Sequence, residues 1–425
     1  MPDAARTTVY AGPTLAEFEL AREVVSAVAD ETPMQGSRYL AEMLGSPVHL
    51  KCENLQRTGS YKIRGAYNRL SQLSPEERAL GVVAASAGNH AQGVALAAAE
   101  LGITATIFMP VGVPLPKLQA TRRYGADVVL RGHTVEEPLL AAAEFAQRTG
   151  AVLIPPFDHP DVIAGQGTLG LEILDQVPDV DTVLVPIGGG GLAAGIASAI
   201  KQKTAGRERP VRVIGVQAAN AAPYPLSLQL GELTAVEIAA TIADGIAVSR
   251  PGVLNFEIIR EAVDQVVTVT DDETARALVV LLERAKLVVE PAGAVGVAAI
   301  LSGKLGTDLG RTVVLLSGGN IDPLMMERVI SRGLVADDRY LSLRIGLPDR
   351  PGQLAEISRL IADVNANVVE VLHTRHGRGL QISEVEIEVS VETRGREHAL
   401  LVVDTLRAAG YEPRTVGNDG EESPR

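Results

Sequence analysis

The chain has little of what several classes of protein require. It carries a single cysteine, Cys52, in 425 residues, so no disulfide can form within it. No apolar stretch long enough to span a bilayer runs without interruption, and the beginning of the chain shows no signal-like pattern. We therefore expect a cytoplasmic protein that depends on neither disulfides nor a membrane.

Basic side chains are also in the minority. Lysine and arginine total 39 against 52 aspartates and glutamates, which leaves a formal net charge of −13 and a sequence pI near 5.1. Such a chain has no basic face for a phosphate backbone. Neither nucleic acid nor an anionic membrane surface is an expected partner.

The length and the apolar pattern predict an α/β protein. A chain of 425 residues with 46% hydrophobic residues suggests two or three domains with sizeable cores. Short, continuous apolar runs alternate with alanine-rich helical stretches, which is typical of parallel sheets covered on both faces. The strands expected in this part of the chain are 48–51, 82–85, 104–109, 127–130, 152–154, 182–187, 211–216, 266–269 and 313–316.

One lysine lies in an unusual setting. Lys62 stands in the stretch Ser-Tyr-Lys-Ile-Arg-Gly-Ala, among small, aromatic and apolar neighbours. A lysine held partly out of water has a lowered pKa, so more of it is the free base that attacks a carbonyl to form a Schiff base. The heptapeptide fits equally a lysine at a helix start whose amine reaches solvent. It leaves both interpretations open.

Three further stretches follow expected strands. Residues 86–90 read Ser-Ala-Gly-Asn-His after an apolar run, where ligands collect in open α/β sheets. Residues 188–191 are four glycines between a strand and a helix, so backbone N–H groups can converge on a phosphate. Residues 317–320 read Ser-Gly-Gly-Asn after another strand. Each stretch alone could be only a tight turn.

Together, and in this order, the four stretches resemble the threonine and serine dehydratase family. This is the β-elimination branch of the tryptophan synthase β-like, or type II, pyridoxal phosphate enzymes. The match extends from about Ala16 to about Arg332. The resemblance implies a two-lobed fold, pyridoxal 5'-phosphate as cofactor, and deamination of L-threonine to 2-oxobutanoate and ammonia, with L-serine as a second substrate. It also implies a homo-oligomer, either a dimer or a tetramer.

The resemblance assigns roles residue by residue. Lys62 is the expected catalytic lysine that binds the cofactor, Asn89 the partner of its phenolic oxygen, and Ser317 the partner of its pyridine nitrogen. Gly245 and Glu290 are expected to line the ring. The expected phosphate loop is Gly188, Gly189, Gly190, Gly191 and Leu192. The expected substrate carboxylate site is Ser86, Ala87, Gly88, Asn89 and His90.

The pattern changes after Gly333. Apolar and polar residues alternate from Leu341 to Leu347, a helix with one apolar face follows, and then two strands and a second helix. This βαββα order, with a final strand near Tyr411, resembles an ACT domain, the ferredoxin-like module that binds amino acids in regulated enzymes. A structural or dimerising appendage is the alternative.

We therefore expect three regions. A catalytic domain covers 1–335, with a smaller lobe at about 67–154, and this lobe boundary follows from the resemblance alone. An ACT domain covers 340–415 and is expected to bind an amino acid effector, with isoleucine as the first candidate. Residues 416–425 are polar and should form a disordered tail. Whether the enzyme serves isoleucine biosynthesis or threonine breakdown stays open.

Metal binding is not expected. Relatives that hold a divalent cation near the phosphate use two carboxylates in the segment that aligns with 217–223. Here those positions are Gln217 and Pro223, and neither can supply a carboxylate.

Other functions keep some support. Serine racemase, cysteine synthase and threonine synthase could share the lysine, the phosphate loop and the serine. A non-catalytic amino-acid sensor could retain an ACT domain on an inactive scaffold, although the combination of Lys62, Asn89, four glycines and Ser317 argues against it. A dinucleotide site is weaker, because no ribose-binding acid follows the glycines at the expected distance.

Overall fold

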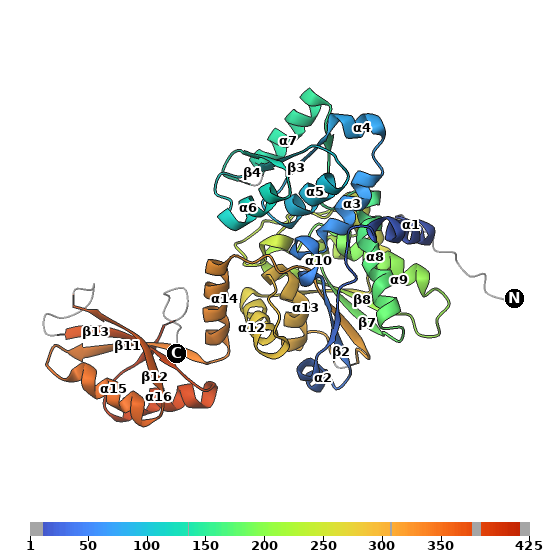
Figure 1. Ribbon diagram of the computed structural model, residues 1–425. Helices are drawn as coiled ribbons and strands as arrows, with labels where there is room; N and C mark the ends of the chain where they lie inside the picture. Colours follow the sequence, from blue (N-terminus) through green and yellow to red (C-terminus); the bar gives the residue numbers. More distant parts are fainter. Residues whose placement is uncertain (1–11, 135, 307, 376–383, 417–425) are drawn as a thin grey trace. The chain divides into compact units, whose positions relative to one another are not determined.

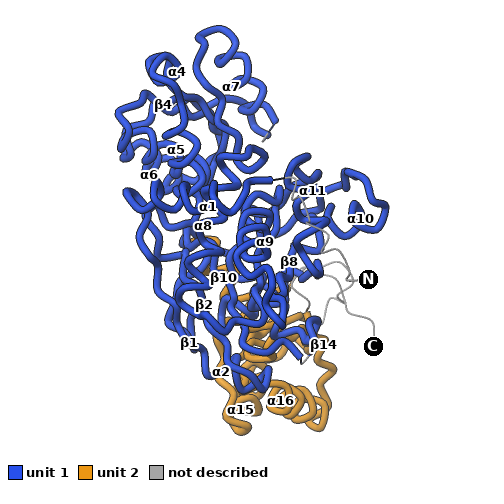
Figure 2. The backbone as a smooth tube through the Cα atoms, turned by 90° about the vertical axis from the view of Figure 1, so that its right-hand side faces the viewer, with its two compact units in different colours: residues 1–323 blue, residues 324–425 orange. Residues whose placement is uncertain are grey.

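The computed structural model describes residues 12–134, 136–306, 308–375 and 384–416, so the expected tail falls almost wholly outside the described residues. The chain divides into two compact units, Met1–Pro323 and Leu324–Arg425 (Figure 2). Among the described residues, no helix is both long enough and apolar enough to cross a membrane.

The larger sheet of the first unit has six strands. Every neighbouring pair is parallel except β1 and β2, which run antiparallel. Every residue of β7 and β10 is buried, as expected for strands covered on both faces. In spatial order the strands are β1 (Met34–Gly36), β2 (Val48–Cys52), β10 (Thr312–Leu316), β7 (Thr182–Pro186), β8 (Arg212–Ala218) and β9 (Gln265–Val269).

Helices cover both faces of this sheet. Helices α8 and α9 lie on one face, and α13, backed by α12, lies on the other (Figure 1). The core between α8, α9, α11 and the sheet is built almost entirely of aliphatic side chains. The helices of this layer are α1 (Leu15–Val25), α2 (Arg38–Leu44), α8 (Pro160–Gln176), α9 (Gly191–Lys203), α10 (Pro223–Leu230), α11 (Val253–Ala262), α12 (Asp271–Val280) and α13 (Pro291–Leu301).

A second, four-stranded parallel sheet is formed by residues 82–153. Its strands are, in order, β5 (Asp127–Leu130), β4 (Ala105–Met109), β3 (Val82–Ala85) and β6 (Val152–Leu153). Val82 and Ala84 pack in one core cluster, while Val83 packs in another with Phe108 and Ala142, because successive residues of a strand face opposite sides. The helices are α4 (Pro75–Leu80), α5 (Asn89–Glu100), α6 (Leu115–Arg123) and α7 (Glu136–Thr149).

Helix α3 (Lys62–Ser71) joins the two sheets. It packs against α5 of the smaller sheet and against α8 of the larger one. The predicted loops 86–90, 188–191 and 317–320 follow the carboxyl ends of β3, β7 and β10, all strands of parallel pairs. The fold therefore concentrates the predicted site residues at strand ends beside α3.

The second unit contains a four-stranded antiparallel sheet with the order β12, β13, β11, β14. Its core is formed by one face of β11 and β13 together with two helices. The elements are α14 (Pro323–Ala336), β11 (Tyr340–Pro348), α15 (Gln353–Asp363), β12 (Asn367–Thr374), β13 (Glu384–Glu392), α16 (Arg396–Ala408) and β14 (Arg414–Thr415). The predicted βαββαβ order is confirmed.

Some boundaries differ from the sequence-based expectation. Helix α1 ends at Val25, because the backbone then tightens into turns with three-residue spacing. Strand β1 follows directly after Pro33, because an edge strand tolerates a proline beside it. The compact division falls after Pro323, the first residue of α14, whereas the sequence suggests a boundary near 335–340; that boundary stays a prediction.

Candidate functional site

Lys62 is the first residue of α3. The chain reaches it through a short 3-10 turn, η2 (Arg57–Gly59), and the Tyr61 N–H then donates to the carbonyl of Ser317 at 3.1 Å. The Lys62 amine donates a hydrogen bond to the carbonyl oxygen of Pro156 at 2.8 Å and lies 5.2 Å from the centre of the Tyr61 ring. The lysine is therefore held against protein groups rather than extended into solvent.

The surroundings of Lys62 change its protonation. Burial lowers the pKa of its amine to about 8, although the nearby Glu290 carboxyl opposes this shift. At pH 7.5 about a quarter of such amines are free bases, against about one in a thousand for an ordinary lysine with a pKa near 10.4. This setting favours a working amine over a lysine that only reaches solvent.

This pKa predicts a distinct reactivity profile for Lys62. In the folded, ligand-free protein, we expect brief acetylation of Lys62 to rise about tenfold per pH unit below pH 8 and to level off above it. The sign follows from the free base, whose fraction grows as the pH rises through the pKa. Mass spectrometry of the Lys62 peptide measures the rate, and the same peptide in the urea-unfolded chain is the control. Identical profiles in the two states would contradict a buried amine.

Asn89 links three separate parts of the chain. Its amide donates to Oε1 of Glu290 at 2.7 Å, and its oxygen accepts from the Asn320 amide at 2.8 Å. The Asn320 amide also donates to the Thr58 carbonyl at 2.6 Å. A Cβ at Gly318 would lie 2.4 Å from the Glu290 carboxyl oxygen, so only glycine allows this approach. Loops after β3 and β10 thus meet beside the turn that carries Lys62.

Glu290 is a buried carboxyl in the same cluster. Burial, and next the charge of Asp244, raise its pKa to about 7, while the Asn89 hydrogen bond, Lys117 and Lys62 lower it. Near neutral pH this group is therefore divided between its acid and its carboxylate. A half-protonated carboxyl beside a lysine that also titrates can store or return a proton.

The four glycines form a cradle at the start of α9. Helix α9 has no side-chain cap, so the N–H groups of its first turn are available to an anion. A Cβ at Gly189 would lie 2.4 Å from the Phe157 ring, and one at Gly191 would lie 2.7 Å from the Phe157 carbonyl. Gly190 has φ +105°, which favours glycine.

The carbonyl of Gly189 is held from behind. It accepts hydrogen bonds from the Tyr224 hydroxyl at 3.1 Å, from the Asn255 amide at 3.0 Å and from the Gly252 N–H at 3.0 Å. In a trans peptide the C=O and the following N–H point in opposite directions, so this anchoring turns the Gly190 N–H toward the cradle. Sequence reasoning missed Tyr224, Asn255 and Phe157, because their only signal is spatial.

The loop 86–90 contributes N–H groups unequally. The Ser86 N–H already donates to the Phe108 carbonyl at 3.1 Å, and the Gly88 N–H donates to the Ser86 hydroxyl at 3.2 Å. Asn89 and His90 begin α5, and first-turn N–H groups have no carbonyl partner within their helix. The loop therefore offers a carboxylate the first turn of α5, rather than every donor in the stretch.

His90 is not available as a general base in this site. Its ring nitrogen Nε2 lies 3.0 Å from the Ile154 carbonyl, and the residue is buried. Burial, and next the charge of Lys62, lower its pKa to about 3. The ring is neutral at physiological pH and donates to the carbonyl, so it fixes residue 154.

The remaining predicted residues lie near the same loops. Ser317 is buried at the end of β10, and Gly245 lies in a short 3-10 turn, 244–246. A Cβ at Gly245 would lie 3.8 Å from Oε1 of Glu290, so the two positions are adjacent. Leu192 is buried in the first turn of α9.

Gln217 has a structural role. Its amide donates to the Ile187 carbonyl at 3.2 Å, and its oxygen accepts from the Tyr224 N–H at 3.0 Å. The residue is buried and fixes the position of Tyr224, whose hydroxyl donates a hydrogen bond to the Gly189 carbonyl. Among the described residues, no group of three or more histidine, cysteine, aspartate or glutamate side chains is arranged to hold a metal ion.

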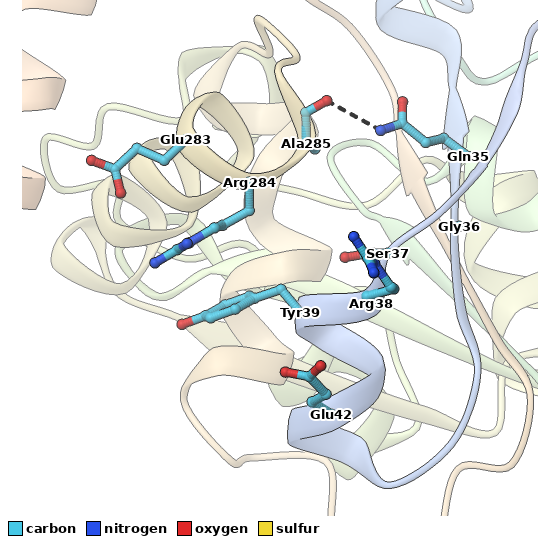
Figure 3. Close-up of a pocket in the computed structure, with 9 residues that line it drawn as sticks. All are labelled: Gln35, Gly36, Ser37, Arg38, Tyr39, Glu42, Glu283, Arg284 and Ala285. Carbon is cyan, nitrogen blue, oxygen red and sulfur yellow. Dashed lines mark hydrogen bonds between the residues drawn. The ribbon is translucent and has the colours of Figure 1, made fainter.

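A cavity of about 490 Å³ lies elsewhere in the first unit (Figure 3). It is lined by residues of β1, α2 and the π-helical turn Leu281–Ala285, and the Gln35 amide closes one side by donating to the Ala285 carbonyl at 3.1 Å. The Arg284 guanidinium lies 5.4 Å from the centre of the Tyr39 ring. None of the predicted site residues lines this cavity.

The donor set fits pyridoxal phosphate. The amine that a carbonyl cofactor needs is Lys62, and its acceptor Pro156 is followed by Phe157, which packs on Gly189 and Gly191. The Lys62 amine and the glycine cradle therefore lie close to each other. The cradle has the open N–H groups and the lack of side chains that a phosphate requires.

Comparison with known proteins agrees with this geometry. Residues 25–318 match the family described as pyridoxal-phosphate dependent enzyme, and residues 341–410 match the ACT domain. The chain is 50% identical over 381 residues to an L-threonine ammonia-lyase of Geobacter sulfurreducens, covering 89% of this chain and 94% of the relative. It is 47% identical over 404 residues to an L-threonine ammonia-lyase of Thermotoga maritima, covering 95% and 100%.

Solved structures of this fold include enzymes with different activities. A threonine deaminase isoform 2 from Solanum lycopersicum has a TM-score of 0.71 and 37% identity, covering 78% of this chain and 98% of its own. Maize serine racemase has a TM-score of 0.71 and 34% identity, covering 77% and 99%. The predicted fold is thereby confirmed. The chain therefore belongs to the pyridoxal-phosphate dependent enzymes and carries a C-terminal ACT domain.

Proposed function

We propose that this lyase deaminates L-threonine to 2-oxobutanoate and ammonia, and L-serine to pyruvate and ammonia. The observation that carries the proposal is the Lys62 amine, held with a lowered pKa beside the glycine cradle. Relatives at about half identity over most of both chains are L-threonine ammonia-lyases. We further propose that the enzyme is a cytoplasmic homo-oligomer.

Specific residues would hold the cofactor. Lys62 would bind its carbonyl, Asn89 its phenolic oxygen and Ser317 its pyridine nitrogen. Gly188, Gly189, Gly190, Gly191 and Leu192 would hold the phosphate, and Gly245 and Glu290 would line the ring. When bound, pyridoxal phosphate supplies a ring that accepts the electron pair left when the substrate loses its α-proton. The first turn of α5 would bind the substrate carboxylate.

Side chains of the protein would carry out the proton transfers of the reaction. The Lys62 amine would take the α-proton of the substrate, because its pKa lies near the working pH. Glu290, with a pKa raised to about 7, can exchange a proton with that amine. Ser317 is neutral and cannot hold the pyridine nitrogen protonated as an aspartate would. A weaker electron sink favours prompt loss of the β-hydroxyl group.

The glycine cradle gives a test of phosphate binding. At Gly190 an added Cβ would lie 2.0 Å from the Tyr224 hydroxyl, and φ is +105°. We expect Gly190→Ala to weaken pyridoxal phosphate binding by about a hundredfold, because even small displacements of a positioned site are costly. Absorbance titration of the cofactor-free protein measures the affinity. Gly206→Ala is the control, since Gly206 also has positive φ but open space around it. Equal losses of cofactor affinity in both variants would show that backbone strain at a positive-φ glycine, rather than contact with the cradle, lowers the affinity.

The proposed activity is tested directly with three substrates. Purified enzyme is incubated with L-threonine, L-serine and D-serine, and 2-oxo acid is measured alongside chiral analysis of the remaining amino acid. The proposal predicts 2-oxobutanoate from L-threonine as the fastest reaction. Interconversion of L- and D-serine without comparable threonine turnover would favour a racemase, an activity carried by a solved structure of the same fold.

The ACT domain is the basis of a second proposal, which concerns control. ACT domains bind amino acids, and the loop between β11 and α15 offers suitable donors. Gly352 is the N-cap residue of α15, has φ +96° and supplies no side-chain cap, so the first-turn N–H groups can bind a carboxylate. We propose that isoleucine or a related branched-chain amino acid binds there and inhibits the enzyme.

This control predicts a measurable coupling. We expect isoleucine to shift the threonine saturation curve of the full-length enzyme by about 5- to 150-fold in apparent affinity, the range of ordinary allosteric coupling. Gly352→Ala should reduce the response without changing the rate in the absence of effector, because it strains only the helix start. Valine and calorimetric binding serve as comparisons. A full-length enzyme that neither binds nor responds to any amino acid would favour a structural appendage.

A further inference from the structure

One short segment contacts both halves of the proposed site. Residues 154–158 connect β6 of the smaller sheet to α8 of the larger one. The Ile154 carbonyl lies 3.0 Å from Nε2 of His90, and the Pro156 carbonyl accepts from the Lys62 amine at 2.8 Å. Phe157 fills the space against Gly189 and Gly191. This connecting segment (154–158) therefore touches the α5 start, the lysine and the glycine cradle in succession.

Asp158 ends the connecting segment and fixes it to α11. Its carboxylate accepts from three successive backbone N–H groups, those of Val253 at 2.8 Å, Leu254 at 3.0 Å and Asn255 at 3.3 Å. Helix α11 has no side-chain cap from its own N-cap residue, Gly252. A carboxylate distant in sequence thus satisfies the first turn of this helix, where negative charge is favoured.

The same turn of α11 holds the glycine cradle. The Gly252 N–H and the Asn255 amide both donate to the Gly189 carbonyl at 3.0 Å. A Cβ at Gly252 would lie 2.7 Å from Oδ1 of Asp158, so glycine is needed for the carboxylate to approach. One helical turn therefore binds Asp158 on one side and Gly189 on the other. Any displacement of Asp158 is transmitted to the Pro156 carbonyl and to the cradle.

We infer that Asp158 is a positioning residue. Through the first turn of α11, it fixes the position of the Lys62 amine relative to the phosphate cradle. The inference rests on the proposed function, because it assigns the amine and the cradle to one cofactor. It differs from a purely structural cap in its consequence. Loss of a cap alone lowers stability, whereas loss of positioning also changes the amine's reactivity and the affinity for the cofactor.

Two variants separate these consequences. Asp158→Ala removes all three hydrogen bonds. Asp158→Asn keeps an oxygen acceptor, and asparagine caps helices as well as aspartate does. The control is Ser74→Ala, which removes a helix cap of the same unit on α4, where the Ser74 hydroxyl accepts from the Glu77 N–H.

The measurements use full-length protein. The first is the pH midpoint of Lys62 acetylation in the cofactor-free protein, and the second is the dissociation constant for pyridoxal phosphate from absorbance. We expect Asp158→Ala to raise the midpoint by at least about half a pH unit as water reaches the amine. We expect it to weaken cofactor affinity by about 10- to 100-fold. Asp158→Asn should restore most of both values, and Ser74→Ala should change neither.

A third variant tests the inference even when Asp158→Ala does not fold. Val253→Pro removes one of the three N–H donors at the first position of α11, where proline is well tolerated. The backbone of Gly252, with φ −66° and ψ 146°, accepts a following proline, and the Val253 side chain is exposed. We expect smaller shifts in the same directions as Asp158→Ala.

The outcomes distinguish this inference from the proposed function. A lower melting temperature in the Asp158 and Val253 variants, with unchanged acetylation midpoint and cofactor affinity, would overturn the positioning role. If the parent enzyme does not turn over threonine, only the proposed function is overturned. The acetylation midpoint and the cofactor dissociation constant do not depend on turnover, so they still test the positioning role.

Discussion

Replacement of Lys62 by alanine is expected to lower turnover of L-threonine by about three orders of magnitude or more, because the enzyme loses both its covalent cofactor link and its proton acceptor. The physical basis is the amine's position. It lies 2.8 Å from the Pro156 carbonyl, and burial lowers its pKa to about 8. Steady-state rates with saturating pyridoxal phosphate measure the effect.

The matched control is another lysine of the same unit. Lys203 lies on the surface and pairs with Glu19 at 2.6 Å, so Lys203→Ala should keep parental turnover. Added amines should not restore Lys62→Ala to the parental rate, because the cofactor also loses its anchor. Parental turnover in Lys62→Ala would refute the assignment of the site.

Glu172→Ala is expected to lower the free energy of unfolding by about 3–5 kcal/mol, because it leaves the buried Lys51 without a carboxylate partner and removes one of the two carboxylates that pair with Arg64. Glu172 on α8 pairs with Lys51 of β2 and, at 2.8 Å, with Arg64 of α3. Lys51 is fully buried, and Arg64 is nearly so. Arg64 also binds Glu53 through two hydrogen bonds of 2.9 Å.

The four charges form one network next to the helix that begins at Lys62. Two cations and two carboxylates balance, and Thr32 and Gln176 add hydrogen bonds. Burial alone would lower the pKa of Arg64, but Glu53 and Glu172 raise it above the usual arginine value. Because α3 begins at Lys62, this network fixes the helix that carries the amine against the larger sheet.

Urea unfolding followed by circular dichroism measures this change in stability, since the chain contains no tryptophan. Asp175→Ala is the control on the same helix. Asp175 pairs with Arg22 at the surface, where side chains are about half exposed, and such pairs contribute at most about 1 kcal/mol. Equal destabilisation by the two substitutions would show that the buried network adds nothing beyond a surface ion pair.

Much of the larger framework could be predicted from local sequence. Continuous apolar strands such as 182–186 and 312–316 require helices on both faces, and the glycines after β7 require a close backbone approach. The alternation after Gly333 likewise predicted the antiparallel sheet of the second unit. These features follow from periodicity and from backbone freedom, which a single stretch of chain displays.

The supports of the site could not be predicted in this way. Asp158, Tyr224 and Asn255 act through contacts with residues between 35 and 97 positions away, and no local pattern marks them. Thr58 adopts φ +65°, an uncommon conformation for a β-branched residue, and its carbonyl then accepts from Asn320. Such strain is held by tertiary contacts, so it is visible only in the folded chain.

The most direct test of the account is the position of the covalent cofactor link. The holoenzyme is reduced with borohydride, digested, and analysed by mass spectrometry for the pyridoxyl group. The account predicts the label on the peptide that contains Lys62, at about one group per chain as required by a single catalytic lysine. A pyridoxyl group on any other lysine, with Lys62 unmodified, would contradict it.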